Sequence, residues 1–277
     1  MTLYQAVAQP FVEFGFMRRA LVACMALALG SGPVGVLLML RRMSLVGDAM
    51  SHAVLPGAAI GYLLAGLSLP AMSLGGVVTR TTALREDASF ASFYLISLAA
   101  GVLIVSLRGS NIDLLHVLFG TILAIDAPAL YLVGTISSFT LLVLAVVYRP
   151  LVVECFDPGF LRAVDGHGSL YHLLFLALLV INLVAGFQAL GTLMAVGLMM
   201  LPAAAAQLWA RSLPGLAATA ACMAMASGFI GLIVSFHLGL ASGPSIVLTA
   251  GLFYALSLLF GPRGWLRRLI PRPHLAG

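Results

Sequence analysis

Residues Ala20 to Leu40 read ALVACMALALGSGPVGVLLML, a stretch of the chain without a single charged side chain. At about 1.5 Å of helical rise per residue, such a stretch can cross the roughly 30 Å hydrocarbon layer of a membrane. Similar stretches recur along the chain, in which 62% of the residues are hydrophobic and only 8% are charged. The sequence therefore predicts an all-α, polytopic transmembrane helical bundle.

Eight clear membrane spans are expected. They are residues 20–40, 44–67, 88–107, 129–147, 170–187, 190–206, 213–236 and 245–260. Between the second and third lies an apolar segment, 68–78, which contains Pro70, Gly75 and Gly76 and is too short to span as a regular helix. No polar interval is long enough for a second domain, so residues 1–277 are expected to form a single transmembrane domain. Gly and Pro residues within 30–33, 56–57 and 202 interrupt their spans. Each could mark a break lined by protein or water, but ordinary kinking and close helix packing are the favoured explanation.

The orientation follows from the fourteen basic residues, all of which are arginine. Nearly all of them can be placed on one side of the membrane, which is then expected to be cytoplasmic. The N-terminus is predicted outside, the C-terminus inside, and the first span is expected to be retained rather than cleaved as a signal peptide. Arg41 and Arg85 fall on the same side only if an even number of crossings separates them. Only one clear span lies between these two arginines, so the predicted topology lacks one crossing. Segment 68–78 is where something is missing or unusual.

The composition also excludes several functions. Without lysine the chain has no Gly-Lys-Ser/Thr phosphate loop, so it is not expected to be its own ATPase. Its net charge of +5 is explained by arginines at span ends, and no nucleic-acid role is expected. Cys24, Cys155 and Cys222, placed in two apolar runs and one loop, show no paired spacing that would indicate a disulfide framework or a zinc ribbon.

A candidate metal site lies in residues 41–57, which read RRMSLVGDAMSHAVLPG. Asp48 and His52 are one helical turn apart, so both side chains point the same way. A carboxylate with an imidazole suits zinc, manganese or iron(II) better than calcium or magnesium. Two ligands are too few for a closed shell, so two copies of the chain could each contribute one pair. The alternative is that Asp48 caps its helix and His52 hydrogen-bonds a neighbouring helix.

The remaining histidines carry weaker signals. His116 follows Asp113 at three-residue spacing, but a half-exposed amphipathic segment near the far interface is the favoured explanation. His237 is expected as a solvated histidine in an external turn, and the rest flank loops or the tail. No hydrolytic metal motif occurs in the sequence.

The central polar interval, residues 153–171, contains an Asp-Pro helix start and, at Gly166, a glycine helix stop. It predicts a short cytoplasmic helix over residues 156–166 that exposes Phe156, Phe160 and Leu161. Exposed aromatic residues between spans indicate either a helix on the membrane surface or a docking site for another protein, and the pattern alone leaves both open.

Several motifs resemble the membrane permeases of bacterial ABC importers for zinc, manganese and iron ions. They are Arg41-Arg42-Met43, the segment from Gly47 to Gly57, Arg85-Glu86-Asp87, Leu118-Phe119-Gly120, Leu201-Pro202-Ala203-Ala204 and Ser242-Gly243-Pro244. The resemblance covers nearly the whole chain. One departure is that the family has a full span where this chain has only residues 68–78.

The resemblance implies a permease in the bacterial cytoplasmic (inner) membrane that pairs with a second copy of itself. It also implies two ATPase subunits on the cytoplasmic face, an extracytoplasmic metal-binding protein and no permanently bound cofactor. As a transport subunit the chain is not expected to be an enzyme. Asp48 and His52 would line the ion path. The segment that couples to the ATPase would comprise Phe156, Asp157, Pro158, Phe160, Leu161 and Arg162.

The expected function is ATP-driven import of a divalent transition-metal ion, with zinc, manganese and iron(II) as candidates. One alternative is a permease for chelated metal, such as a siderophore or cobalamin, which needs a wide cavity rather than paired ligands. Another is a secondary metal/proton antiporter, in which an intramembrane Asp and His would serve equally well.

Overall fold

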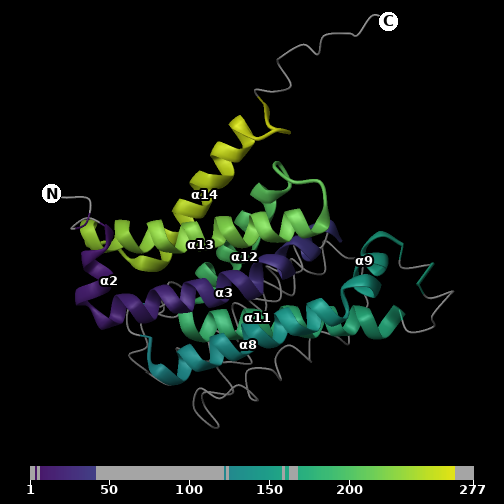
Figure 1. Ribbon diagram of the computed structural model, residues 1–277, viewed down its shortest axis with the longest axis horizontal. Helices are drawn as coiled ribbons and strands as arrows, with labels where there is room; N and C mark the ends of the chain where they lie inside the picture. The colour runs from purple at the N-terminus through teal and green to yellow at the C-terminus, as the bar shows by residue number, and fades with distance from the viewer. Residues whose placement is uncertain are drawn as a thin grey trace, which may run out of the picture.

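The computed structural model describes residues 4, 7–41, 122, 125–157, 160–161 and 168–265 of the chain. Within these ranges the regular elements are helices and no strand occurs, which confirms the all-α prediction for this part. In chain order the helices are α2 (Gln9–Glu13), α3 (Gly15–Leu40), α8 (Ala127–Val146), α9 (Tyr148–Phe156), α11 (Gly168–Leu190), α12 (Thr192–Ala206), α13 (Leu213–Leu238) and α14 (Ser242–Phe260) (Figure 1).

Five of these helices are long and apolar enough to cross a membrane. They are α3, α8, α13 and α14 over their full lengths and α11 over Leu170–Phe187, whereas α12 has only 15 residues. These six helices match six of the predicted spans to within five residues at each end. The predicted spans 44–67 and 88–107 and the short segment 68–78 lie outside the described residues. The total of eight spans therefore stays a prediction.

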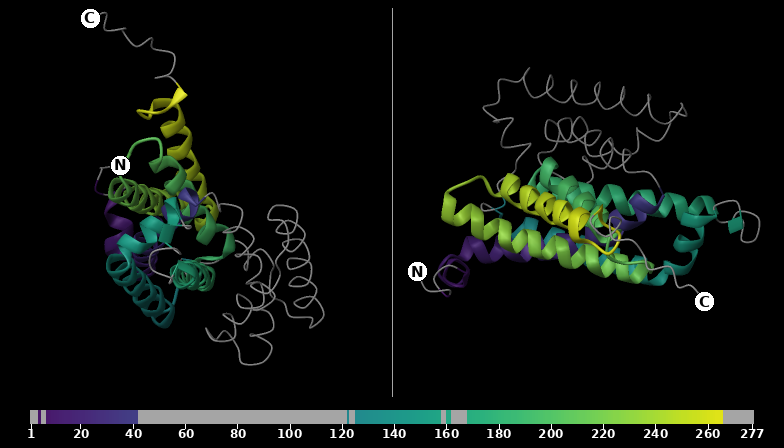
Figure 2. Two further views of the ribbon diagram at one scale, coloured as in Figure 1. Left: turned by 90° about the vertical axis from the view of Figure 1, so that its right-hand side faces the viewer. Right: turned by 90° about the horizontal axis from the view of Figure 1, so that it is seen from above.

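Helix α3 lies at the centre of the described bundle, between α13 on one side and α8 with α11 on the other (Figures 1 and 2). In its most apolar stretch 67% of the residues are buried, against 22% in α8 and 28% in α14. Its buried residues include Ala20, Cys24 and Leu27, which belong to the largest apolar cluster. Helices α8 and α14 therefore form the periphery, and side chains such as Leu142 and Leu248 are exposed there.

The Gly and Pro residues do not break α3 or α12, which agrees with the favoured interpretation of close helix packing. Helix α3 continues through Pro33, and α12 continues through Pro202. A proline removes one backbone hydrogen bond from a helix, but dense packing by neighbouring helices can still hold the helix together. Inside α3 the hydroxyl of Ser31 donates to the carbonyl oxygen of Leu27 at 2.7 Å, so this buried polar group is also satisfied within the helix.

Small residues let the backbones approach closely, as is typical of membrane helix interfaces. A methyl group placed on Gly32 of α3 would lie 3.2 Å from the Cα atom of Ala221 in α13. One placed on Gly35 would collide with the carbonyl oxygen of Met199 in α12. Gly32 and Gly35 are thus the positions where α13 and α12 pack against α3.

Four arginines lie at one end of the bundle, which we call the arginine end: Arg41, Arg149, Arg211 and Arg263. There, Met39 and Leu40 at the end of α3 pack in a cluster with Ala206 of α12. The backbone N–H of Arg263, after α14, donates to the carbonyl oxygen of Leu208 at 3.2 Å. The grouping agrees with the prediction that most arginines share one side of the membrane.

The opposite end carries an aromatic cluster where the short helix α2 packs beside α3 and α13. The rings of Phe11 and Phe229 stack with their centroids 5.4 Å apart, and Phe14 contacts Phe236 at the same distance. His237 was expected in a loop, but it occupies the last turn of α13, which Gly239 ends in a left-handed conformation with φ of 65°.

Candidate functional site

The predicted ion ligands, Asp48 and His52, lie outside the described residues, as does His116. Arg41 is the last described residue before them and forms the C-cap of α3, with its backbone N–H bonded to the Leu37 carbonyl oxygen at 3.1 Å. Among the described residues, no group of three or more His, Cys, Asp and Glu side chains could hold a metal ion. The described part is therefore the scaffold that leads into the candidate metal site.

The predicted coupling segment begins differently from the expectation. Phe156 is the last residue of α9 rather than the first of a new helix, and Cys155 lies in this helix rather than in a loop. Asp157 follows with a non-helical backbone, and its carboxylate accepts a hydrogen bond from the backbone N–H of Phe160 at 2.9 Å. This is the N-cap geometry that the Asp-Pro pair predicts. Pro158 and Arg162 lie outside the described residues.

Two of the three predicted exposed side chains are exposed. The Phe156 side chain has 71% of its surface accessible and Phe160 has 57%, but Leu161 has only 7%. The prediction for Leu161 is wrong because successive residues in a helical turn point about 100° apart, so Leu161 turns toward the protein when Phe160 faces outward. The described part of the coupling segment therefore presents two phenylalanine rings.

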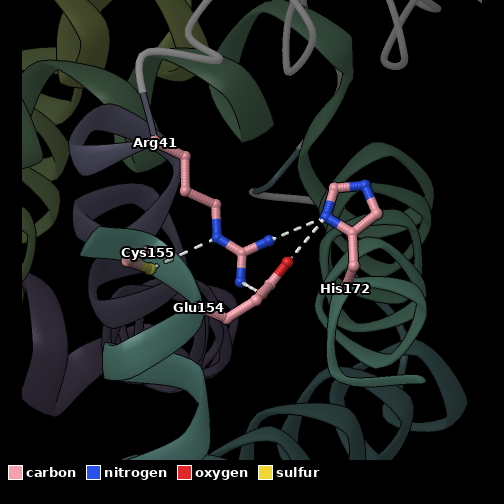
Figure 3. A network of polar contacts seen from close by, with 4 residues as sticks. All are labelled: Arg41, Glu154, Cys155 and His172. Atoms are coloured by element: carbon pink, nitrogen blue, oxygen red, sulfur yellow. Dashed lines mark hydrogen bonds and ion pairs between the residues drawn. The ribbon is translucent and has the colours of Figure 1, made fainter. Parts of the chain in front are cut away.

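A polar network joins the end of α3 to α9 and α11 (Figure 3). The guanidinium of Arg41, from the end of α3, forms an ion pair with Glu154 of α9. Its Nε also donates to the Cys155 sulfur at 3.2 Å, and its Nη1 lies 3.1 Å from Nδ1 of His172 in α11. The guanidinium carbon lies 4.1 Å from the centre of the Phe175 ring, in cation–π geometry.

Both charges of this network are buried, since 5% of the Arg41 side chain and 6% of the Glu154 side chain are exposed. Nδ1 of His172 also lies 3.0 Å from Oε1 of Glu154. One ring nitrogen can accept from Arg41 or donate to Glu154, but not both, so the tautomer decides which bond forms. Removing one partner of a buried ion pair typically costs about 3–5 kcal/mol, because the other charge stays buried without compensation.

Sequence reasoning missed this network, because it treated Glu154 and Cys155 as loop residues and His172 as a residue beside a loop. The usable signal was an acid at the end of one apolar stretch and an arginine at the end of another, both predicted on the same side of the membrane. Opposite charges at such positions can pair and so lower the desolvation penalty of each.

A second polar group lies within the bundle, between α3, α8 and α11. Nδ2 of Asn182 donates to the Thr140 hydroxyl and to the Leu178 carbonyl oxygen, both at 2.8 Å. Within the described residues, Oδ1 of Asn182 and the hydroxyl of Ser137 have no hydrogen-bond partner. A methyl group on Gly30 would lie within 3.0 Å of both oxygens, so α3 packs against them closely.

A cavity of about 320 Å³ also lies at the arginine end, between α3, α8, α9 and α13. Its lining includes Pro33, Leu37, Leu144 and Leu151. None of its described lining residues carries a carboxylate, imidazole or thiol, so it offers no ligand to a metal ion.

Long apolar helices, closely packed small residues and arginines gathered at one end make this a polytopic helical membrane protein. The chain matches the model of the ABC 3 transport family over residues 13–261, and it belongs to that family. This membership confirms the resemblance derived from the sequence motifs.

Individual relatives share most of their length with this chain. It is 32% identical over 260 residues to the manganese import system permease protein ScaB of Streptococcus parasanguinis, covering 91% of this chain and 92% of ScaB. It is 34% identical over 261 residues to the manganese transport system membrane protein MntC of Halalkalibacterium halodurans, covering 91% of this chain and 89% of MntC. The structure is similar to PsaBC from Streptococcus pneumoniae, solved in complex with Fab, with a TM-score of 0.87, 28% identity and coverage of 96% of this chain and 99% of that chain.

Proposed function

We propose that this chain is the membrane permease of an ATP-driven importer of divalent transition-metal ions, with manganese as the first candidate. The observation that carries the proposal is the match to the ABC 3 transport family over residues 13–261. The names of two relatives, a manganese import permease and a manganese transport membrane protein, favour manganese over zinc. ATP hydrolysis belongs to a separate subunit, since the chain has no lysine for a phosphate loop.

Asp48 and His52 are the proposed ion ligands. Their spacing presents a carboxylate and an imidazole on one helix face, and a pair from each of two copies gives a two-Asp, two-His site. Transport requires a site that releases its ion, so an incomplete protein shell completed by water suits this role. Rocking of the two copies, driven by ATP binding and hydrolysis in the partner, opens the site alternately to each side.

The two ATPase subunits dock at the arginine end, which we assign to the cytoplasmic side. Phe156 and Phe160 are exposed beside that end, and aromatic residues of this kind are typical anchors of protein interfaces. The opposite end, with α2 and the aromatic cluster, then faces the extracytoplasmic metal-binding protein. This orientation places the N-terminus outside and the C-terminus inside a bacterial cytoplasmic membrane.

Chelated iron is the second candidate cargo. The chain is 29% identical over 266 residues to the chelated iron transport system membrane protein YfeD of Yersinia pestis, covering 93% of this chain and 89% of YfeD. A secondary antiporter, by contrast, is disfavoured by the family match, because it would need no ATPase partner.

Uptake of radioactive manganese, zinc and iron would test the proposal, in bacteria that lack their own importers and co-express the chain with its ATPase and binding protein. We expect ATP-dependent manganese uptake that is lost in Asp48→Asn and in His52→Ala at equal membrane abundance. The matched control is Asp126→Asn, because Asp126 is an exposed acid that caps α8 and asparagine caps equally well.

No uptake of any metal by a wild-type chain that reaches the membrane would contradict the importer. Uptake by Asp48→Asn equal to that of Asp126→Asn would leave the importer standing and remove the proposed ion site. Uptake of iron only when it is supplied as a chelate would favour the second candidate.

A further inference from the structure

The buried ion pair of Arg41 and Glu154 lies between the two places that the proposed transport cycle must connect. On one side, Arg41 caps α3, and only six residues separate it from Asp48 along the chain. On the other side, Glu154 lies two residues before the exposed Phe156 in α9. The pair is therefore a direct contact between the segment that docks the ATPase and the segment that leads to the ion ligands.

Helix α9 has few other means of attachment to the bundle. Of its nine residues, only Leu151 and Glu154 are buried. Leu151 packs with Leu37 of α3 and Phe175 of α11 in one apolar cluster. An apolar contact of this kind is non-directional and can slide, whereas an ion pair supported by hydrogen bonds fixes direction and distance.

The Arg41 guanidinium is held from several directions at once. Glu154 and Cys155 contact it from α9, while His172 and the Phe175 ring contact it from α11. A planar guanidinium can make these contacts together, whereas a lysine ammonium would act as a single point charge on a flexible stem. A displacement of α9 is thus transmitted to the end of α3 through a defined geometry.

Resting on the proposed function, we propose that the Arg41–Glu154 pair is the positioning contact that transmits movement of the docked ATPase to the helix end preceding Asp48. Neither residue touches the ion in this proposal. Loss of the pair uncouples the two activities: the ATPase still docks through Phe156 and Phe160 and hydrolyses ATP, but fewer ions cross the membrane for each ATP.

The test uses the full chain with its ATPase and binding protein, purified and reconstituted in liposomes, with manganese as the ion. It measures manganese uptake, ATP hydrolysis and the amount of ATPase that co-purifies with each variant. The variants are Glu154→Gln, Arg41→Lys and the reversed pair Arg41→Glu with Glu154→Arg. The matched control is Arg211→Gln, because Arg211 is an exposed arginine at the same end of the bundle and lies outside the network.

We expect Glu154→Gln to lower the ions imported per ATP by about ten-fold, a coupling effect of usual size for one contact in such a network. Arg41→Lys should fall between this variant and the wild type, the reversed pair should recover part of the loss, and Arg211→Gln should match the wild type. ATPase co-purification should stay unchanged in every variant.

An unchanged ratio of ions to ATP in Glu154→Gln would overturn the inference, and so would a fall in uptake that only follows a loss of bound ATPase. Failure of all three network variants to reach the membrane would overturn it as well, since the pair would then be a folding element. If the wild-type complex imports no metal, the proposed function itself fails, whatever the variants do.

Discussion

Asn182 of α11 donates a hydrogen bond to the hydroxyl of Thr140 in α8 at 2.8 Å, within the buried part of the bundle. The two residues are 42 positions apart, so this bond joins two helices rather than supporting one. In a membrane bundle such bonds stabilise modestly, because the separated helices can find other partners in the lipid.

Replacing Thr140 with valine should lower the free energy of unfolding by about 0.6 kcal/mol and by no more than about 1.7 kcal/mol, the average and the maximum for interhelical hydrogen bonds in membranes. Valine keeps the shape of threonine and removes only the hydroxyl. Unfolding of the purified chain by a denaturing detergent, followed by circular dichroism, would measure the change. Thr219→Val is the control, because the Thr219 hydroxyl donates to the carbonyl oxygen of Gly215 within its own helix. Equal losses in both variants would contradict a role in joining the helices.

Gly231 of α13 should tolerate alanine poorly. A methyl group there would lie 2.5 Å from the Cα atom of Ile246 in α14, so the two backbones would have to separate. Overpacking of this kind costs about 1–3 kcal/mol. Thermal unfolding in detergent would measure the loss of stability.

Gly251→Ala is the matched control in the neighbouring helix, since nothing lies within 4 Å of the added methyl group. It should leave stability unchanged or raise it by up to about 1 kcal/mol, as alanine favours a helix. If Gly231→Ala proved as stable as Gly251→Ala, the close approach of α13 and α14 would be wrong.

The ion pair at the arginine end should show strong non-additivity in stability. Arg41→Met or Glu154→Leu alone leaves one buried charge without its partner and should cost about 3–5 kcal/mol. The double variant Arg41→Met with Glu154→Leu should recover much of this loss, because two apolar side chains replace the pair. A double-mutant cycle of denaturant unfolding checks this, and losses that simply add would show that the two charges do not interact.

The exposed ring of Phe160 should matter for the partner rather than for the fold. Phe160→Ala should leave the unfolding temperature of the isolated permease unchanged but weaken ATPase binding by about 2 kcal/mol or more, as expected for an aromatic anchor at an interface. Binding of purified ATPase to the permease in nanodiscs would measure this. Phe139→Ala, which removes a half-exposed ring from α8, is the control and should bind ATPase normally.

Much of the fold could be predicted from the sequence because length and apolarity decide whether a segment spans a membrane. The expected span 213–236 and the observed α13 (Leu213–Leu238) differ by only two residues. The packing of α12 and α13 against Gly32 and Gly35 of α3 could not be predicted, because these contacts join residues far apart in the sequence. The sequence shows where the glycines are, but not which helices pack against them.

The candidate site was predictable only in its local features. The Asp-Pro pair predicted the cap by Asp157, and the exposed rings of Phe156 and Phe160 were expected. The network around Arg41 depends on Glu154 and His172, which lie 113 and 131 residues away from Arg41 along the chain. Such tertiary contacts produce no periodic pattern in the sequence from which they could be predicted. The ion ligands Asp48 and His52 stay a prediction.

The central position of α3 has a consequence for how the protein is made. Of the described membrane helices it is synthesised first, yet Met199 and Ala221, which pack against its Gly35 and Gly32, follow those glycines by more than 160 residues. A newly synthesised α3 therefore enters the lipid before α12 and α13, which pack against it, have been made. The packing around Gly32 and Gly35 can be completed only in the last third of translation. Chains that stop before α12 should therefore be degraded by membrane quality control.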